Sequence, residues 1–498
     1  MTKKLLLSIT LASLLASSSL LSQENLDADL GGFDTEEVVS QESGDLDGFG
    51  DEEENSDLDG FGDDEIAAVE EIASEAEDKE VMFSLSGDLA FKTSYGYHSH
   101  RVDAQQGSNA IDYSGFNQAQ TSLYLQVDGK LSDNWKVRIS GDAYYDAIYN
   151  LHPNNNYNDD TLDTYKTQLM LTDTYIQGRL TNEIDLKVGR QIVVWGKSDS
   201  IRITDVINPL DNRLPGLTDI EDLRLSVGMA KVDYYIGQWN FSAMAIGESR
   251  IMLEAAPRGE FFPVDNVFPL GAPDPFIELE TPDSSWDNMQ YALAANGVFS
   301  GWDLSFYAAD VLDQKWHIEN VGTPNAKRVV TKVKMLGSAI NIATGSWLLK
   351  SEVAYLDGVK YNSTTDDKAR LDTLIGFDYM GIKDTVLSLE LANRHIFDYE
   401  TQMSSLVGTP DYVDKNEIQT AMRATRSFEN DSINATALVS MFGASWEYGG
   451  FARVWVEYDV MDAVVANFGV VDYIDGDKPF IKAISDNDRV FADITYSF

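Results

Sequence analysis

From Met82 to Phe498 the chain alternates hydrophobic and polar residues with a period of two. Leu123, Leu125 and Val127, for example, alternate with Tyr124, Gln126 and Asp128. This period predicts β-strands that each have one apolar and one polar face. A water-soluble sandwich and a barrel that encloses a lumen produce the same alternation, so the period alone does not separate them.

The alternating segments predict sixteen strands. They cover residues 82–96, 116–131, 135–149, 166–181, 184–194, 226–237, 239–249, 287–299, 301–312, 329–344, 346–357, 370–380, 383–397, 433–448, 450–461 and 488–498.

The lengths of the connections favour the barrel. Seven predicted joins are tight, Gly449 among them, and the other eight run from about 12 to 37 residues, with the two kinds in strict alternation. Transmembrane barrels have this arrangement, with short periplasmic turns, long external loops and an even strand number. The last strand ends on Phe498 and is similar to the C-terminal signal read by the barrel-assembly machinery. We therefore predict an all-β, transmembrane antiparallel barrel over residues 81–498.

The first residues predict a secretory signal peptide. Lys3 and Lys4 precede an apolar run from Leu5 to Ala16, which small residues follow. Cleavage after Ser18 and cleavage after Ser22 both fit, and we assign residues 1–22 to the signal. A run of this length is too short for a membrane-spanning helix.

Residues 23–80 form an acidic, low-complexity segment that we predict to be a disordered periplasmic tail. From Glu24 to Glu80 there are 24 acidic residues and one basic residue. Hydrophobic residues are too sparse there to offset the entropy of ordering the chain. Near-helical spacing of apolar residues over 65–78 predicts one short helix.

A short unit repeats in this tail, with Phe49 in one copy and Phe61 in the next. One interpretation is a solvated acidic spacer. Another is a docking peptide, in which each Phe enters a pocket of a periplasmic partner while the carboxylates face a basic rim. A calcium loop is disfavoured, because Phe49 stands where a Ca²⁺ loop needs an oxygen ligand.

Charge and composition exclude several functions. The chain has 37 Lys and Arg residues against 82 Asp and Glu residues, a formal charge of -45, and this excludes a nucleic-acid-binding protein. With no Cys, it has no thiolate nucleophile and no Cys-ligated metal. His98 and His100 share one face of a strand, but two ligands do not define a metal site. We predict no catalytic residue, no metal and no cofactor.

The phase of the strands assigns charged and polar residues to the lumen. Charges of both signs on a pore wall create a transverse field that sorts solutes, although structural ion pairs filling a narrow lumen have the same signature. The candidates are Gln126, Asp128, Arg138, Asp142, Glu390, Arg394, Arg453, Glu457 and Asp459.

A polar motif follows the fifth predicted strand. The strand ends at a Trp-Gly break, and the chain then turns at Asn-Pro. The polar residues either bend inward as a constriction, cap an opening, or form an exposed loop. The motif residues are Arg190, Gln191, Trp195, Gly196, Asn208, Pro209 and Asp211.

The run Gly-Arg-Gln-x-Val-x-Trp-Gly at 189–196, followed by Ile-Asn-Pro-x-Asp at 207–211, resembles a family of Gram-negative outer-membrane barrel proteins of unknown function. Members are often encoded beside hydrophobe-type resistance–nodulation–division exporters. Lys197 stands where many members have Glu, so a role for a carboxylate at that position does not carry over. The resemblance implies transport together with an inner-membrane export partner.

We expect an outer-membrane channel or transport partner for a small or amphiphilic solute, in contact with lipopolysaccharide. The alternative is a structural barrel with a closed lumen whose acidic tail binds a periplasmic partner. Porins of this predicted strand number are often trimers, so a homotrimer is also expected.

Overall fold

A computed structural model describes residues 82–102, 111–152, 157–257, 259–262, 279–320, 327–362, 364, 366–404 and 412–498. The signal peptide, the acidic tail, Phe49 and Phe61 lie outside the described residues. No described helix is long and apolar enough to cross a membrane.

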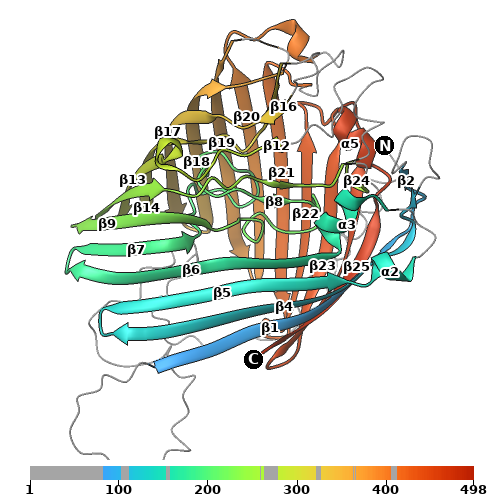
Figure 1. Cartoon of the computed structure of the whole chain (residues 1–498), viewed down its shortest axis with the longest axis horizontal. Helices are drawn as coiled ribbons and strands as arrows, with labels where there is room; N and C mark the ends of the chain where they lie inside the picture. The colour runs from blue at the N-terminus through green and yellow to red at the C-terminus, as the bar shows by residue number, and fades with distance from the viewer. Residues whose placement is uncertain are drawn as a thin grey trace, which may run out of the picture. The chain divides into compact units, whose positions relative to one another are not determined.

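Eighteen antiparallel strands form a closed barrel (Figure 1). Each pairs with its neighbours in chain order, and β25 pairs with β1 from Asp88↔Ser497 to Gly96↔Arg489, which closes the ring. The barrel strands are β1 (Met82–Gly96), β4 (Gly115–Ser132), β5 (Trp135–Asp146), β6 (Thr167–Thr181), β7 (Ile184–Gln191), β9 (Val227–Ile236), β10 (Trp239–Ile246), β13 (Gln290–Phe299), β14 (Trp302–Leu312), β17 (Lys332–Thr344), β18 (Trp347–Val359), β19 (Lys368–Ile382), β20 (Thr385–Ile396), β21 (Asn416–Phe428), β22 (Ile433–Phe442), β23 (Gly450–Met461), β24 (Val464–Ile474) and β25 (Arg489–Ser497).

The prediction of an all-β antiparallel barrel is confirmed, but the predicted number of sixteen strands is wrong. The two missed strands are β21 and β24. In β21 the lumen face carries Gln419 and Arg423, and Thr420, Ala424 and Arg426 interrupt the apolar residues of the other face, so the apolar alternation is weak. The turn before β24 consists of Asp462 and Ala463, without the Gly, Pro or Asn that usually marks a turn.

The missed strands also inverted part of the predicted topology. Short connections of two residues, and one of four residues at 429–432, join the strands at one end of the barrel, here called the turn end. Longer connections join them at the opposite loop end. Gly449 lies in the connection 443–449 at the loop end, not at the turn end as predicted.

The connections carry short elements of their own. They are β2 (Arg101–Val102), β3 (Ile111–Asp112), α2 (Ile148–Leu151), α3 (Asp159–Tyr165), β8 (Asp211–Asn212), β11 (Leu253–Glu254), β12 (Leu279–Glu280), η3 (Trp286–Asn288), β15 (His317–Glu319), β16 (Lys327–Val329), η4 (Thr401–Ser404) and α5 (Pro479–Ile484).

The outer surface of the barrel is apolar. Side chains such as Phe241, Leu293 and Leu336 point away from the lumen and are exposed. Aromatic rings gather near the turn end. The ring centroids of Phe299 and Trp302 lie 4.3 Å apart in a stack, and those of Trp347 and Tyr379 lie 4.6 Å apart. An apolar band bordered by aromatic residues is the surface that a membrane-spanning barrel presents to lipid.

Candidate functional site

The connection between β7 and β9, residues 192–226, folds into the barrel, and we call it the lumen loop. The chain leaves the wall after Gln191 and turns at Gly196, whose φ is 93°. A Cβ atom at Gly196 would lie 2.8 Å from both carboxylate oxygens of Glu352 on β18. Only glycine therefore allows the loop to approach the wall this closely.

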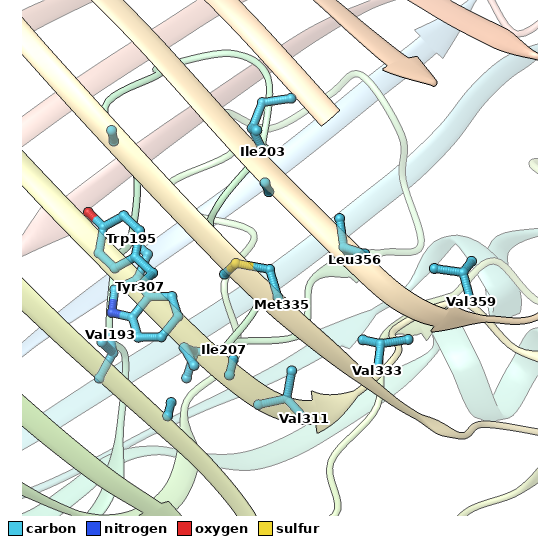
Figure 2. Close-up of a cluster of buried hydrophobic side chains, with 14 of the residues drawn as sticks. Val193, Trp195, Ile203, Ile207, Tyr307, Val311, Val333, Met335, Leu356 and Val359 are labelled. Carbon is cyan, nitrogen blue, oxygen red and sulfur yellow. The ribbon is translucent and has the colours of Figure 1, made fainter. Parts of the chain in front are cut away.

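One side of the lumen loop packs into an apolar cluster against the wall (Figure 2). The Trp195 ring stacks on Tyr307 of β14, with 4.7 Å between centroids and an interplanar angle of 21°. Ile203 and Ile207 are buried in the same cluster as the wall residue Met335. The lumen next to β9–β20 is thus filled by close-packed side chains rather than by water.

Two buried wall carboxylates hold the tip of the lumen loop. Glu352 Oε1 accepts hydrogen bonds from the amides of Lys197 (2.6 Å) and Ser198 (2.8 Å), and Oε2 accepts from the amide (3.1 Å) and hydroxyl (2.8 Å) of Thr204. Glu390 on β20 accepts from the amides of Asp199 (2.7 Å) and Ser200 (3.1 Å). A carboxylate that accepts hydrogen bonds from several backbone amides holds a loop firmly, because each of these hydrogen bonds is charge-assisted.

Ion pairs reinforce the same contact. Lys350 Nζ lies 2.5 Å from Asp199 of the lumen loop and 2.7 Å from Asp378 of the wall. Lys197 Nζ lies 3.2 Å from Asp303 on β14. The tip of the lumen loop is therefore held against strands β14 to β20 by charges on both partners.

The Asn-Pro turn closes the base of the lumen loop. The Asn208 side chain is fully buried and accepts a hydrogen bond from the Val193 amide (2.8 Å). Its amide group donates to the carbonyls of Gln191 (3.2 Å) and Leu225 (2.8 Å), and the Pro209 carbonyl accepts from the Leu225 amide (2.8 Å). One side chain thus connects the start, middle and end of the loop.

The other charged motif residues make local ion pairs. Arg190 forms a bidentate pair with Glu248, at 3.0 and 2.5 Å. Asp211 pairs with Arg213, which also donates to the hydroxyl of Tyr144 on β5 (3.0 Å).

A cavity of about 690 Å³ lies on the other side of the lumen loop. Strands β1, β4, β5, β6 and β25 form its outer wall, and the lumen loop with the start of the β10–β13 connection bounds it opposite. Charged residues occur on both sides. They include Asp88, Lys92, Asp142 and Asp493 on the strands, and Arg213, Asp222, Arg224 and Arg250 on the connections.

Some of the predicted lumen residues form one network. Arg138 donates to Asp128 (2.7 Å), and Gln126 donates to the same carboxylate (2.6 Å). Asp142 lines the cavity and accepts from Gln168 (2.5 Å).

The other predicted lumen residues lie on β20 and β23. Glu390 anchors the lumen loop as described, and Arg394 donates to the carbonyl of Arg202 in that loop (3.3 Å). Arg453 pairs with Asp219 of the same loop and lies 3.8 Å from the Trp455 ring centroid. Glu457 and Asp459 are exposed and share the face of β23 that carries Arg453.

Sequence reasoning missed Glu352, Lys350 and Asp219. The strand predicted at 346–357 was available for phasing, and it places Lys350 and Glu352 on the face opposite Leu349 and Val353. Asp219 had no signal, because its partner Arg453 lies 234 residues away along the chain.

The loop end of the cavity is covered by residues of three connections. Glu260 pairs with Arg489 (2.6 Å) and accepts from the Asn117 amide group (3.1 Å). His100 Nε2 lies 3.1 Å from the Glu260 carbonyl, and burial lowers the pKa of this imidazole. His98 faces Asp488 instead, at 3.8 Å. Within the described ranges no group of three or more His, Cys, Asp or Glu residues is placed to hold a metal.

The family model described as "Protein of unknown function (DUF1302)" matches residues 8–498. None of the curated proteins matches the sequence. Among solved structures, the chain is similar to OccAB1 of Acinetobacter baumannii, with 12% identity over 83% of this chain and 96% of that one, and a TM-score of 0.47. It is also similar to two proteins of Pseudomonas aeruginosa. The outer membrane protein opdK is 10% identical over 83% of this chain and 98% of that one, with a TM-score of 0.45. OccK9 is 11% identical over 84% of this chain and 98% of that one, with a TM-score of 0.46.

Proposed function

The chain belongs to the DUF1302 family of proteins of unknown function, and we propose that it works as an outer-membrane channel for a small or amphiphilic solute. Location in the outer membrane follows from the closed antiparallel barrel and its apolar outer surface.

The observation that carries the proposal is the arrangement of the lumen loop. Buried Glu352 and Glu390 fix its tip against β18 and β20. Arg213 of the loop also reaches Tyr144 of β5 and Gln168 of β6, so the loop narrows the lumen and leaves a cavity beside β1, β4, β5 and β6. The remaining cavity is lined by charged and polar residues of both signs together with Met170, Leu214 and Leu217. Such a lining suits a solute that has both polar and apolar parts.

Conductance across planar bilayers tests the channel. The purified chain is expected to give steady, ion-selective current steps. A barrel that inserts in its folded form, shown by a heat-dependent shift in gel mobility, and that never conducts would overturn the proposal.

An inner-membrane export partner is the finer part of the proposal, supported by the family resemblance. Crosslinking in intact cells followed by purification of the barrel should recover an inner-membrane transporter. Recovery of envelope proteins without any transporter would refute this part and leave the channel untouched.

The packed apolar cluster favours a second function, a docking barrel whose lumen stays closed. In this alternative the acidic tail binds a periplasmic partner through Phe49 and Phe61. Replacing both residues with Ala should then abolish recovery of that partner, and unchanged recovery would exclude the idea.

A further inference from the structure

Strand β6 is paired on one side only along its loop-end half. On the β5 side the pairing extends to Tyr145↔Thr167, whereas on the β7 side it stops at Thr174↔Arg190. Residues 167–173 thus run past the end of β7, over about 24 Å of strand at the usual rise per residue. Figure 1 shows β6 continuing beyond β7 toward the loop end.

Side chains, and not a ladder of backbone hydrogen bonds, face this edge in the described part of the chain. The Arg190 guanidinium donates to the Leu171 carbonyl (3.0 Å), and Arg250 Nη2 lies 2.6 Å from the Met170 sulfur. Nearer the loop end, the Ala256 amide donates to the Tyr165 hydroxyl (3.2 Å). Contacts of this kind separate at a smaller cost than a strand ladder, because few bonds must break.

The edge lies at the level of lipid. Leu169 and Leu171 point outward with 89% and 54% of their surface exposed. Their neighbours Gln168, Met170 and Thr172 line the cavity on the other face. An unpaired strand edge is tolerated at membrane depth only where it borders a water-filled or protein-lined space, so the cavity and the bilayer meet at this edge.

Arg250 places a positive charge at the same edge. Both carboxylate oxygens of Glu248 are bound by Arg190, and Arg250 instead donates to the Ser226 carbonyl (2.6 Å). Asp142, a wall carboxylate that interacts electrostatically with Arg250, accepts a hydrogen bond from Gln168. Arg250 therefore has no carboxylate in contact among the described residues and lines the cavity.

We propose that the edge of β6 at residues 167–172, together with Arg250, forms a side portal between the cavity and the outer membrane for an amphiphile with an anionic head and an apolar tail. The head would contact the Arg250 guanidinium, and the tail would pass Met170 toward the lipid that surrounds Leu169 and Leu171. The proposal rests on the proposed channel and specifies its substrate class and its route.

The absence of Cys makes a two-quencher experiment direct. Thr172→Cys places a bimane label at the portal. Ser122→Cys is the matched control, because Ser122 also lines the cavity but its strand is paired on both sides, with Ala90 and with Tyr144. Each labelled protein is reconstituted in vesicles and exposed to iodide in water, to a doxyl-labelled fatty acid and to a doxyl-labelled alkylammonium.

Three results are expected. Iodide quenches both positions, the doxyl fatty acid quenches position 172 but not 122, and the alkylammonium quenches 172 weakly. Adding Arg250→Gln should make quenching by the fatty acid about tenfold weaker, because the head group then loses one charge-assisted hydrogen bond. Arg250→Lys should restore most of it.

Each contrary result identifies which idea fails. Quenching of both positions by iodide and of neither by the fatty acid would overturn the portal and leave the channel standing. Equal quenching by both amphiphiles, unchanged by Arg250→Gln, would overturn the anionic head. If iodide reaches neither position while the fatty acid reaches 172, the portal holds and the diffusion channel fails.

Discussion

Replacing Glu352 with Gln should release the tip of the lumen loop and raise the conductance of the barrel. Glu352 is 2% exposed and its two oxygens accept four hydrogen bonds from Lys197, Ser198 and Thr204. An amide keeps one carbonyl oxygen but turns an NH2 group toward donors on the other side. The side chain therefore loses its charge and two of its four acceptor contacts.

The magnitude follows from the number of bonds. A hydrogen bond to a charged group contributes about 1.5–3 kcal/mol. Two lost bonds destabilise the attached loop by roughly 3–6 kcal/mol, which shifts the equilibrium toward a detached loop by a factor of roughly one hundred or more. Glu390 accepts only two such bonds, from Asp199 and Ser200, so Glu390→Gln should have the smaller effect.

Single-channel recording in planar bilayers is the assay. Glu352→Gln should give larger and more variable current steps than the unmodified chain, with Glu390→Gln between the two. Glu319→Gln is the control, because Glu319 is a partly exposed carboxylate on β15 that faces His317 and not the lumen loop. Folded Glu352→Gln and Glu352→Ala barrels with the current steps of the unmodified chain would refute the reasoning.

Other substitutions test the loop and the barrel. Asn208→Ala removes three buried hydrogen bonds and should destabilise the lumen loop by about 3 kcal/mol, seen as faster tryptic cleavage at Arg202 and Arg213; unchanged cleavage would show that the turn does not depend on this side chain. Trp195→Ala removes the stack on Tyr307 and should lower the free energy of unfolding by about 3–5 kcal/mol in urea titrations, whereas Trp195→Phe should cost much less. Phe498 exchanges two backbone hydrogen bonds of 2.9 Å with Gly87, which Phe498→Ala keeps. If assembly machinery reads the ring, Phe498→Ala should reduce the amount of folded barrel in cells but not the stability of refolded protein, and a parallel loss of both would point to stability alone.

The period of two was sufficient to predict the barrel, because lipid outside and polar groups inside impose the alternation on most strands. It failed for β21, because Thr420, Ala424 and Arg426 interrupt the apolar residues on the face opposite Gln419 and Arg423. It also failed at Asp462-Ala463, where Asp462 is the one turn-favouring residue and the ladders on both sides determine the turn. Long-range pairing supplied what the local pattern lacked.

The candidate site was predictable only in part. The motif around Trp195 and Asn208 stood out because Trp-Gly and Asn-Pro are unusual after a strand. Its inward path depends on Glu352 and Glu390, which follow it by more than 140 residues. A local sequence pattern cannot predict contacts between residues so far apart in the chain. The position of Arg250 beside β6 likewise depends on tertiary contacts.

The attachment of the lumen loop also has a consequence for how the chain folds. Its anchoring contacts span 155 residues from Lys197 to Glu352 and 191 residues from Asp199 to Glu390. Contacts of such high sequence separation carry a large loop-closure entropy and form slowly. The lumen loop therefore reaches its final position only after β18 and β20 have joined the wall, and until then the nascent barrel has a wider interior than the finished one.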